Sequence, residues 1–539
     1  MASIHSLSNE LLDMVLSKLK NKDVLAVITT CTSLKRNAER CLYSRVKLVV
    51  PKPERHDATK VLPVHRFFMT LSQRPELAEM VRSLRLIGVG MFSSRQHTCA
   101  LPCDEAVLEA WLTAAERVGV TSIKPSTRQL IETGNPSVFV AILLAMCTEL
   151  TSLTLHLSLL WEPELLAAVL VSRGGNSKLK EARIKNDRDS EGVREGCHEI
   201  PLWNLIQAFA HSPQLETLQV VLPAHESFSF DETMPVIQFP RVKSLTISDF
   251  GVNKKNVKSL LRCFPALTQI DYFLAMNYDD VICEERDSKV HDDGWRKLQD
   301  ALEVKKDSLT LLFISVDFTY TDDYPPDDLD AEYMDATWER MGSMSCKAFH
   351  RLQKLQIPVI ALLSAHRSQV KHDLSELIPQ SLRRLILRDD CIWDTGVNGQ
   401  SWVVPVHPQG ESMARRHRLG TYYLAGALVT ILEEFLTSHV GCDSYRLNSL
   451  CLRVLLRRIW SEANLERLRA ASSRAGILCT IREMPGSAGI GTLKGKYREV
   501  IIHQGSGKQL IKLKGNLMYE SKFAMRYVKE PRKIFEYNC

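Results

Sequence analysis

A short hydrophobic string recurs along most of this 539-residue chain. It consists of an apolar residue, two variable residues, a second apolar residue, one variable residue and a third apolar residue. Its fourth and sixth residues lie on the same side of a strand, because side chains in a strand alternate with a period of two. The copies are VRSLRL at Val81, LTSLTL at Leu150, LKEARI at Leu179, LETLQV at Leu215, VKSLTI at Val242, LTQIDY at Leu267, LTLLFI at Leu309, LQKLQI at Leu352, LRRLIL at Leu382 and LNSLCL at Leu447. The string therefore predicts a series of short strands, each with one buried side.

Segments with helical periodicity lie between these strings. In NPSVFVAILLAMCTEL, Asn135 is a good N-cap, and Pro136 stands at the first helical position, where its missing N–H costs nothing. Similar segments are EPELLAAVLVSR, PLWNLIQAFAHSPQL, NKKNVKSLLRCFPAL and DGWRKLQDALEVKKDSL. One strand–helix unit cannot bury its apolar side alone, so the units are expected to stack. The pattern predicts an α/β fold, an irregular leucine-rich-repeat solenoid (horseshoe) over residues 81–483.

The spacing of the strings is irregular. Their starts are separated by 25 to 69 residues, whereas regular leucine-rich repeats are roughly 20–29 residues long. The Asn or Cys expected at the ninth position is replaced by Ser158, Pro223, Phe250, Asp317 and Asp390. An ordinary α/β protein is the alternative. Short Leu–x–x–Leu strings without phosphate-binding glycine turns favour the irregular solenoid, with insertions such as 319–335 and 393–418 as solvated loops.

Composition and apolar runs narrow the class of protein. A hydrophobic fraction of 45% and a charged fraction of 24% are typical of a soluble folded protein. No signal peptide is expected, because Asp13 and Lys18 interrupt the apolar stretch from Leu11. The longest apolar runs, Val138–Cys147 and Tyr422–Leu432, are shorter than the roughly 20 residues that span a bilayer. We therefore predict buried helices, no membrane partner, and a location in the cytoplasm, the nucleus or both.

The fourteen cysteines include no Cys–x–x–Cys pair. Without a secretory signal, this distribution predicts reduced thiols that pack as small apolar residues. The tightest group is His97, Cys99 and Cys103, but a tetrahedral zinc site usually needs a second pair of ligands. We therefore expect no metal and no cofactor.

The basic charge of the chain is concentrated at its C-terminal end. The net charge is +6, and residues 484–539 contain eleven Lys and Arg against four Asp and Glu. The remainder is close to neutral, so the sequence gives no indication of nucleic-acid binding throughout. Within 484–539, REVIIHQGSGKQLIKLK (498–514) predicts a basic β-hairpin that closes the end of the solenoid.

The first fifty residues predict three short amphipathic helices. The first runs from Asn9 to Leu19 with Ser8 as its N-cap, and Asn21 or Asp23 can cap the second. The third lies in SLKRNAERCLYSRV. These helices carry more apolar positions than so small a bundle can bury, which suggests an apolar face for a partner. The alternative is that they cap the first repeat.

This N-terminal segment resembles an F-box, whose usual run is Leu-Pro-x-Glu, an apolar helix, Asp-Leu and a later Cys. Ser8 replaces the usual Pro, and Val24 replaces the Leu that follows Asp. The continuation FFMTLSQRPELAEMVRSLRL (67–86) is similar to the junction in fungal F-box proteins with leucine-rich repeats, where an Arg-Pro-x-Leu segment leads into the first repeat strand. The resemblance extends loosely to Glu483. The residues that match the F-box in order are Leu7, Glu10, Leu11, Val15, Leu19, Asp23, Leu25 and Cys31.

The resemblance implies a three-helix F-box at 1–48, a connecting segment at 49–80, the solenoid at 81–483 and a basic extension at 484–539. It implies that the F-box docks on the Skp-type adaptor of a Skp–cullin–F-box ubiquitin ligase while the solenoid holds a substrate protein. Such a subunit needs no catalytic group, because tethering raises the effective concentration of a substrate lysine. The implied adaptor contacts are Leu7, Ser8, Glu10, Leu11, Val15, Asp23 and Leu25. The candidate substrate contacts are the variable strand positions His156, Gln219, Arg383 and Arg388.

Two other classes of function compete with this interpretation. One is a non-catalytic protein-binding scaffold that acts outside ubiquitination. The other is an enzyme, but the glycine-rich segment GSAGIGTLKGK (486–496) fits neither the dinucleotide fingerprint nor the P-loop. Gly-x-Ser-x-Gly and His-Glu-x-x-His are absent from the sequence, and the acidic run at 322–328 is typical of a solvated segment. We therefore expect a protein that is not itself an enzyme.

Overall fold

The structure, a computed structural model, describes the chain in stretches separated by gaps. The described residues are 7–50, 62–88, 101, 105–123, 126–172, 177–185, 202–222, 237–249, 254–277, 294–319, 342–363, 373–388, 428–440, 446–454, 462–483 and 499–503. Two compact units make up the chain. The first contains Met1–Val290, Asp300–Leu309 and Phe318–Thr321, and the second contains the other residues.

Parallel strands in chain order form the sheet of each unit. In the first unit each strand pairs with the next one, from β1 to β7. These strands are β1 (Arg45–Val50), β2 (Ser83–Gly88), β3 (Ser152–His156), β4 (Glu181–Lys185), β5 (Thr217–Leu222), β6 (Ser244–Asp249) and β7 (Gln269–Asn277). The second unit contains β9 (Lys354–Pro358), β10 (Arg384–Arg388), β11 (Ser449–Val454), β12 (Leu478–Glu483) and β13 (Glu499–His503), together with most of β8 (Leu311–Thr319), whose last two residues belong to the first unit. In the described chain, β1–β12 are parallel strands, β13 runs antiparallel to β12, and the sheet is open and not a barrel.

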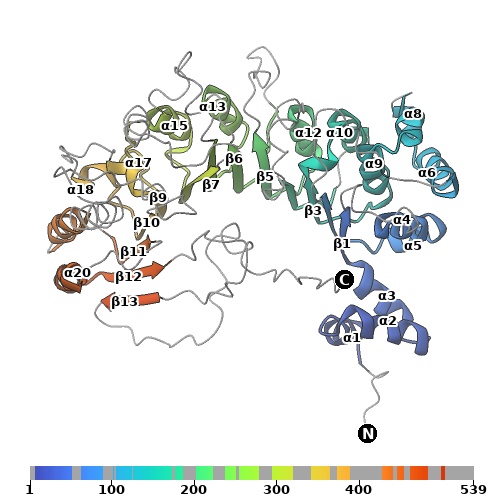
Figure 1. Cartoon of the computed structure of the whole chain (residues 1–539), viewed down its shortest axis with the longest axis horizontal. Helices are drawn as coiled ribbons and strands as arrows, with labels where there is room; N and C mark the ends of the chain where they lie inside the picture. The colour runs from blue at the N-terminus through green and yellow to red at the C-terminus, as the bar shows by residue number, and fades with distance from the viewer. Residues whose placement is uncertain are drawn as a thin grey trace, which may run out of the picture. The chain divides into compact units, whose positions relative to one another are not determined.

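Helices connect the strands, so the mixed α/β class expected from the sequence is confirmed. Figure 1 shows α9, α10, α12 and α13 along one side of the strands of the first unit. The helices of the first unit that follow β1 are α4 (Pro63–Gln73), α5 (Pro75–Ala78), α6 (Glu105–Arg117), α7 (Val120–Ile123), α8 (Thr127–Glu132), α9 (Pro136–Met146), η3 (Leu157–Leu159), α10 (Pro163–Ser172), α12 (Trp203–Ala208), η5 (Phe209–His211), α13 (Lys254–Arg262) and η8 (Glu303–Lys305). The second unit has α17 (Val359–Leu363), α18 (Leu374–Leu377), a helix over 428–438 and α20 (Glu462–Ala475), and α15 (Gly294–Leu302) crosses the boundary between the units.

All ten predicted strings form strands, and each strand begins two residues after its string starts. The fourth and sixth residues of the strings are buried, as in Leu84 and Leu86 of β2 or Leu385 and Leu387 of β10. The prediction from the period of two is therefore confirmed. Three described strands lie outside the ten strings, namely β1, β12 and β13. Of these, β1 pairs with β2 over six residues directly after the N-terminal helices.

A recurring hydrogen bond sets the starting point of the strands. The carbonyl of Ser44 accepts from two successive amides, those of Arg82 (3.1 Å) and Ser83 (2.9 Å). The carbonyl of Arg82 in turn accepts from the amides of Thr151 and Ser152. The same double acceptance recurs at the carbonyls of Thr151, Lys180, Glu216, Lys243, Thr310, Gln353 and Arg383. The starts of β2–β7 and β9–β11 are thus fixed against the preceding strand, whatever the length of chain between them.

The helical predictions hold at α9, which begins at Pro136 as expected. Asn135 caps it, because its side-chain oxygen accepts from the amide of Ser137 at 2.9 Å. All of its side chains are buried, which matches the prediction of a buried helix over Val138–Cys147. Within the described residues, no helix is both long enough and apolar enough to span a membrane.

An aromatic cluster joins three helices of the first unit. Trp111 of α6 lies 4.7 Å from Phe139 of α9 and 5.5 Å from Phe68 of α4, between ring centroids. His65 of α4 lies 5.3 Å from the indole of Trp111. These side chains are almost fully buried. The cluster therefore fixes α6, which lies in the longest interval between strings, against the helices that border the strands.

The described cysteines have free thiols, and five of them are buried. Burial raises the pKa of Cys147, Cys346 and Cys479 to about 12. Buried protonated thiols of this kind pack as small apolar groups, as predicted for these residues.

Candidate functional site

Three short helices form the N-terminal part of the first unit: α1 (Asn9–Leu16), α2 (Asn21–Thr30) and α3 (Lys35–Tyr43). Ser8 caps α1 as predicted, and its hydroxyl accepts from the amide of Leu11 at 3.5 Å. The helix ends three residues earlier than predicted. The predicted capping of α2 by Asn21 or Asp23 was wrong, because Lys20 occupies the N-cap without a side-chain hydrogen bond and Asp23 lies in the first turn.

A small apolar core holds these helices together. Leu16, Val24 and Ala38 are buried at its centre, one from each helix. Partly buried side chains pack around them, namely Val27, Ile28, Cys41 and Leu42. Val24 therefore contributes to internal packing.

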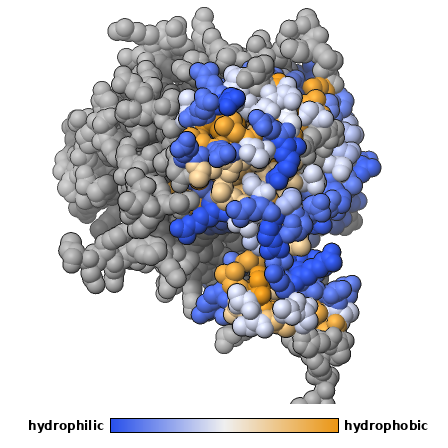
Figure 2. All heavy atoms as spheres, turned by 90° about the vertical axis from the view of Figure 1, so that its right-hand side faces the viewer, coloured by the Kyte–Doolittle hydropathy of each residue, from blue (hydrophilic) through white to orange (hydrophobic). Residues whose placement is uncertain are grey.

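The same helices expose an apolar surface. The exposed side chains are Leu11 (46% exposed), Met14 (59%), Val15 (44%), Leu19 (40%) and Leu25 (49%). We call these residues the α1–α2 apolar surface. They are five of the nine exposed large hydrophobic side chains in the described part of the chain. Figure 2 shows hydrophobic residues on the small lobe at the bottom of the view, where α1–α3 lie. Such a concentration of exposed apolar side chains is typical of a partner-binding surface.

The structure places the predicted adaptor contacts on or beside this surface. Leu11, Val15 and Leu25 belong to it, and the other four are exposed or partly exposed. Its own backbone amide and the Ser8 hydroxyl lower the pKa of Glu10, which keeps this carboxylate charged at the start of α1. Sequence reasoning missed Met14, although its spacing of three residues from Leu11 could have indicated a shared helix face.

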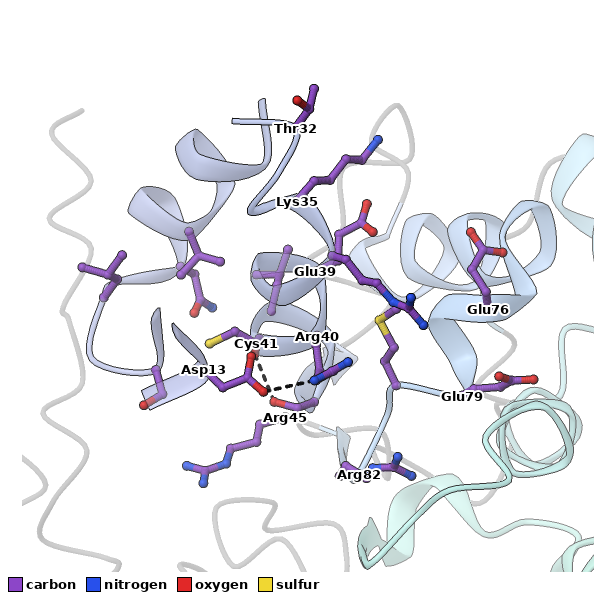
Figure 3. Close-up of a pocket in the computed structure, with 18 residues that line it drawn as sticks. Asp13, Thr32, Lys35, Glu39, Arg40, Cys41, Arg45, Glu76, Glu79 and Arg82 are labelled. Atoms are coloured by element: carbon purple, nitrogen blue, oxygen red, sulfur yellow. Dashed lines mark hydrogen bonds and ion pairs between the residues drawn. The ribbon is translucent and has the colours of Figure 1, made fainter. Parts of the chain in front are cut away.

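Polar contacts at partly exposed positions tie α1 to α3. The Asn37 amide donates to Asn9 Oδ1 at 3.1 Å and to Asp13 Oδ1 at 3.2 Å. Arg40 Nη1 donates to Asp13 Oδ2 at 3.3 Å, and Figure 3 shows these two side chains pointing toward each other. These contacts hold α1, which carries most of the apolar surface, in one orientation on α3.

A bidentate ion pair joins α3 to the segment that leads into β2. Arg74 donates to both carboxylate oxygens of Glu39, at 2.8 and 3.2 Å, and its Nε donates to Glu76 at 2.8 Å. Glu39 is buried, and together with Glu76 it raises the pKa of Arg74. The neighbouring Leu77 is fully buried. The Arg-Pro-x-Leu segment seen in the sequence thus attaches α3 to the segment that leads into β2.

Replacing Arg74 by Ala should weaken the attachment of α3 to the segment before β2. The change leaves the Glu39 carboxylate buried without its main cation, which is unfavourable, although the exposed part of Arg74 reduces the effect. We expect a loss of about 1 kcal/mol in the free energy of unfolding and faster hydrogen exchange in α3. Arg128→Ala, which removes an exposed helical ion pair with Glu132, is the matched control. Equal exchange in the two variants would contradict a role for Arg74 in attaching α3.

A cavity of about 840 Å³ lies between α1, α3 and the α5 region. Its labelled side chains carry both signs of charge (Figure 3). The cations are Lys35, Arg36, Arg40, Arg45 and Arg82, and the anions are Asp13, Glu39, Glu76 and Glu79. Among the described residues, no group of three His, Cys, Asp or Glu side chains is placed to hold a metal ion. The lining thus indicates no particular class of small ligand.

The predicted substrate contacts lie on different parts of the sheet. His156 in β3 and Gln219 in β5 face away from the buried leucines in the first unit, and Arg388 occupies a similar position in β10 of the second. Arg383 precedes β10, and its carbonyl accepts from the amides of Asn448 and Ser449. Burial lowers the pKa of His156 to about 4, and the nearby positive charges of Lys185, Arg85 and Lys47 act in the same direction.

Several sequence features lie wholly or mainly outside the described residues. They are the ligand group His97, Cys99 and Cys103, the insertions at 319–335 and 393–418, the glycine-rich segment at 486–496 and the second strand of the predicted hairpin. The first strand of that hairpin is β13, which pairs with β12.

The described residues thus present an exposed apolar surface on α1 and α2, anchored through α3, and a sheet face rich in polar side chains. Both features suit binding of other proteins. No protein-family model matches this chain, and no curated protein matches it either.

Proposed function

We propose that this chain is the substrate-recognition subunit of a Skp–cullin–F-box type ubiquitin ligase. In this assignment α1–α3 are the F-box, and the strand–helix units form an irregular leucine-rich-repeat solenoid. The α1–α2 apolar surface docks on a Skp-type adaptor, and the sheet holds a substrate protein. The chain supplies no catalytic group and acts by raising the effective concentration of a substrate lysine near the charged enzyme.

The exposure of Leu11, Val15 and Leu25 carries this proposal. The F-box resemblance assigns adaptor contacts to these positions, and their side chains are exposed while Leu16 and Val24 fill the core. The two departures from the F-box pattern also have a physical account. Ser8 starts α1 by accepting a hydrogen bond from Leu11, and Val24 changes internal packing instead of the surface.

The solenoid part of the proposal is supported by the regular strand register. Neighbouring strands align the same string positions, and the double hydrogen bond recurs at the starts of β2–β7 in the first unit and β9–β11 in the second. Such repetition is what stacked units with a shared core require.

Co-expression of the full chain with a Skp-type adaptor, followed by size-exclusion chromatography, tests the proposal. We expect co-elution, and we expect Val15→Asp to weaken adaptor binding by about tenfold, since it places a charge at an apolar contact. Leu11→Asp combined with Val15→Asp should abolish co-elution. Val171→Asp is the matched control, because Val171 in α10 is 45% exposed and Val15 is 44% exposed.

The possible results separate the classes of function. If the intact folded chain elutes without the adaptor, the ligase assignment is wrong, and a scaffold that acts outside ubiquitination becomes the better interpretation. If Val171→Asp weakens adaptor binding as much as Val15→Asp, the α1–α2 apolar surface is not the docking site.

A further inference from the structure

Basic side chains gather on one face of the sheet of the first unit, over β1–β4. Lys47 of β1 lies beside Arg85 of β2, and Arg85 lies beside Thr154 of β3. Thr154 lies beside Arg183 of β4. Because these strands are parallel and in register, the four side chains form one row on the side opposite the buried leucines.

The next row on the same face adds another cation. Lys185 follows Arg183 by two residues in β4 and lies beside His156 of β3. We call Lys47, Arg85, Arg183 and Lys185 the basic strand face. Glu181 is the acidic residue that the described strands β1–β4 place on this side, and it forms an ion pair with Arg183. The described side chains of the face therefore carry a positive net charge.

The environment of His156 is consistent with this arrangement of cations. The ring is 7% exposed, and after burial itself the largest influences that lower its pKa are Lys185 and Arg85. Arg85 is partly buried, and its Nε has no hydrogen-bond partner among the described residues. The face thus presents one exposed cation, Lys47, beside Arg85 and Lys185, which are partly buried, and Arg183, which is buried.

We propose that the basic strand face binds an acidic segment, rich in Asp and Glu, of a partner protein. The acidic segment is then a class of substrate, and its identification as a substrate rests on the proposed function. Neighbouring strands are about 4.8 Å apart, so the cations from β1 to β4 are spread over about 14 Å. Alternate carboxylates of an extended chain are roughly 6.6 Å apart. A distributed row of cations therefore suits a run of carboxylates better than one compact anion.

The second unit, taken by itself, repeats the same chemistry. Arg388 of β10 lies beside Arg453 of β11, and Arg384 lies beside Lys354 of β9. These side chains also lie on the side opposite the buried leucines. Because like charges on neighbouring strands repel each other, an acidic partner would stabilise each of these rows.

Direct binding of a labelled peptide to the full chain tests the inference. The probe is a fluorescein-labelled sixteen-residue peptide of alternating Glu and Ser, compared with Lys–Ser and phosphoserine–Gly peptides of equal length. We expect the Glu–Ser peptide to bind, with an affinity that falls as salt is added. Lys47→Glu combined with Lys185→Glu should weaken its binding by about tenfold.

The matched control is Lys243→Glu combined with Lys258→Glu. Lys243 is exposed and directly precedes β6, and Lys258 is partly exposed on α13, so the change of net charge is the same at a different place. We expect this control to change the affinity by less than about twofold. Lys47→Gln with Lys185→Gln, which removes charge without adding repulsion, should weaken binding by about threefold even if the Glu variant folds poorly.

Equal affinity for both charge-reversed variants would overturn the inference, as would binding of the phosphoserine peptide alone. The result can be separated from the ligase proposal. Lys47 and Lys185 lie outside α1–α3, so their substitution should leave co-elution with the adaptor intact. Loss of peptide binding with adaptor binding retained supports the assignment. A failure of the intact chain to bind the Glu–Ser peptide, with adaptor binding retained, rejects the basic strand face alone.

Discussion

Replacing Trp111 by Ala should remove about 4 kcal/mol from the free energy of unfolding of the first unit. Trp111 is 0% exposed and contacts His65, Phe68 and Phe139 from two other helices. The substitution leaves a cavity that rigid neighbours from α4 and α9 can fill only in part, and it removes favourable aromatic contacts. The melting temperature of this unit should fall by roughly 10 °C. Thermal unfolding followed by far-UV circular dichroism measures the change.

Trp161→Ala is the control for this prediction. The Trp161 side chain is 36% exposed, and its indole N–H donates to the carbonyl of Ser158 at 3.0 Å. We expect a loss of about 1 kcal/mol there. A similar loss for the two tryptophans would show that the aromatic cluster does not organise α4, α6 and α9.

The stability of the first unit should fall as the pH is lowered from 6.5 toward 4, and His156 should account for part of this fall. Burial lowers the pKa of this histidine to about 4 in the folded chain, whereas an unfolded histidine titrates near its ordinary value of 6.5. Between these two pH values the unfolded chain binds the additional proton, so unfolding is favoured. The contribution of His156 should reach about 2 kcal/mol at pH 5. Above pH 6.5 neither state is protonated at this site, and the contribution vanishes.

Denaturant unfolding of the wild-type chain and His156→Gln at pH 7, 6 and 5 tests this expectation. The variant should lose less stability between pH 7 and pH 5 than the wild type does. His211→Gln, at an exposed position, is the control and should keep the wild-type pH dependence. Identical pH dependence in wild type and His156→Gln would mean that the ring becomes protonated without unfolding.

The strands could be predicted because one pattern determines both their direction and their buried side. The alternation of apolar residues requires a half-buried strand, and every string identified formed one. The first strand was missed because its string, YSRVKL, begins with Tyr43 and follows directly after the third helix. The start of α9 could also be predicted, because Asn135 is a good N-cap and Pro136 is favoured at the first helical position.

The contacts that assemble the candidate surfaces could not be predicted in the same way. Glu39 and Arg74 are far apart in the sequence, and their pairing depends on how α3 packs against the segment before β2. The basic strand face brings together residues from separate strands, so it emerges only when the register is known. The exposed positions of α1 and α2 could not be identified for a different reason. Their apolar character was evident, but burial of Leu12 and exposure of Leu11 can be distinguished only after the helices pack.

The double hydrogen bond at the strand starts has a consequence for how such a chain can change over evolution. Strands β2–β7 and β9–β11 are positioned by hydrogen bonds to the carbonyl before the preceding strand, and the chain that connects the two strands takes no part in these bonds. Lengthening a connection then carries a small entropic penalty, about 0.6 kcal/mol for each doubling of a flexible loop. Insertions can therefore accumulate between strands, and vary freely between relatives, while the sheet itself keeps its register. A new recognition element can be added to this fold without redesigning the part that supports it.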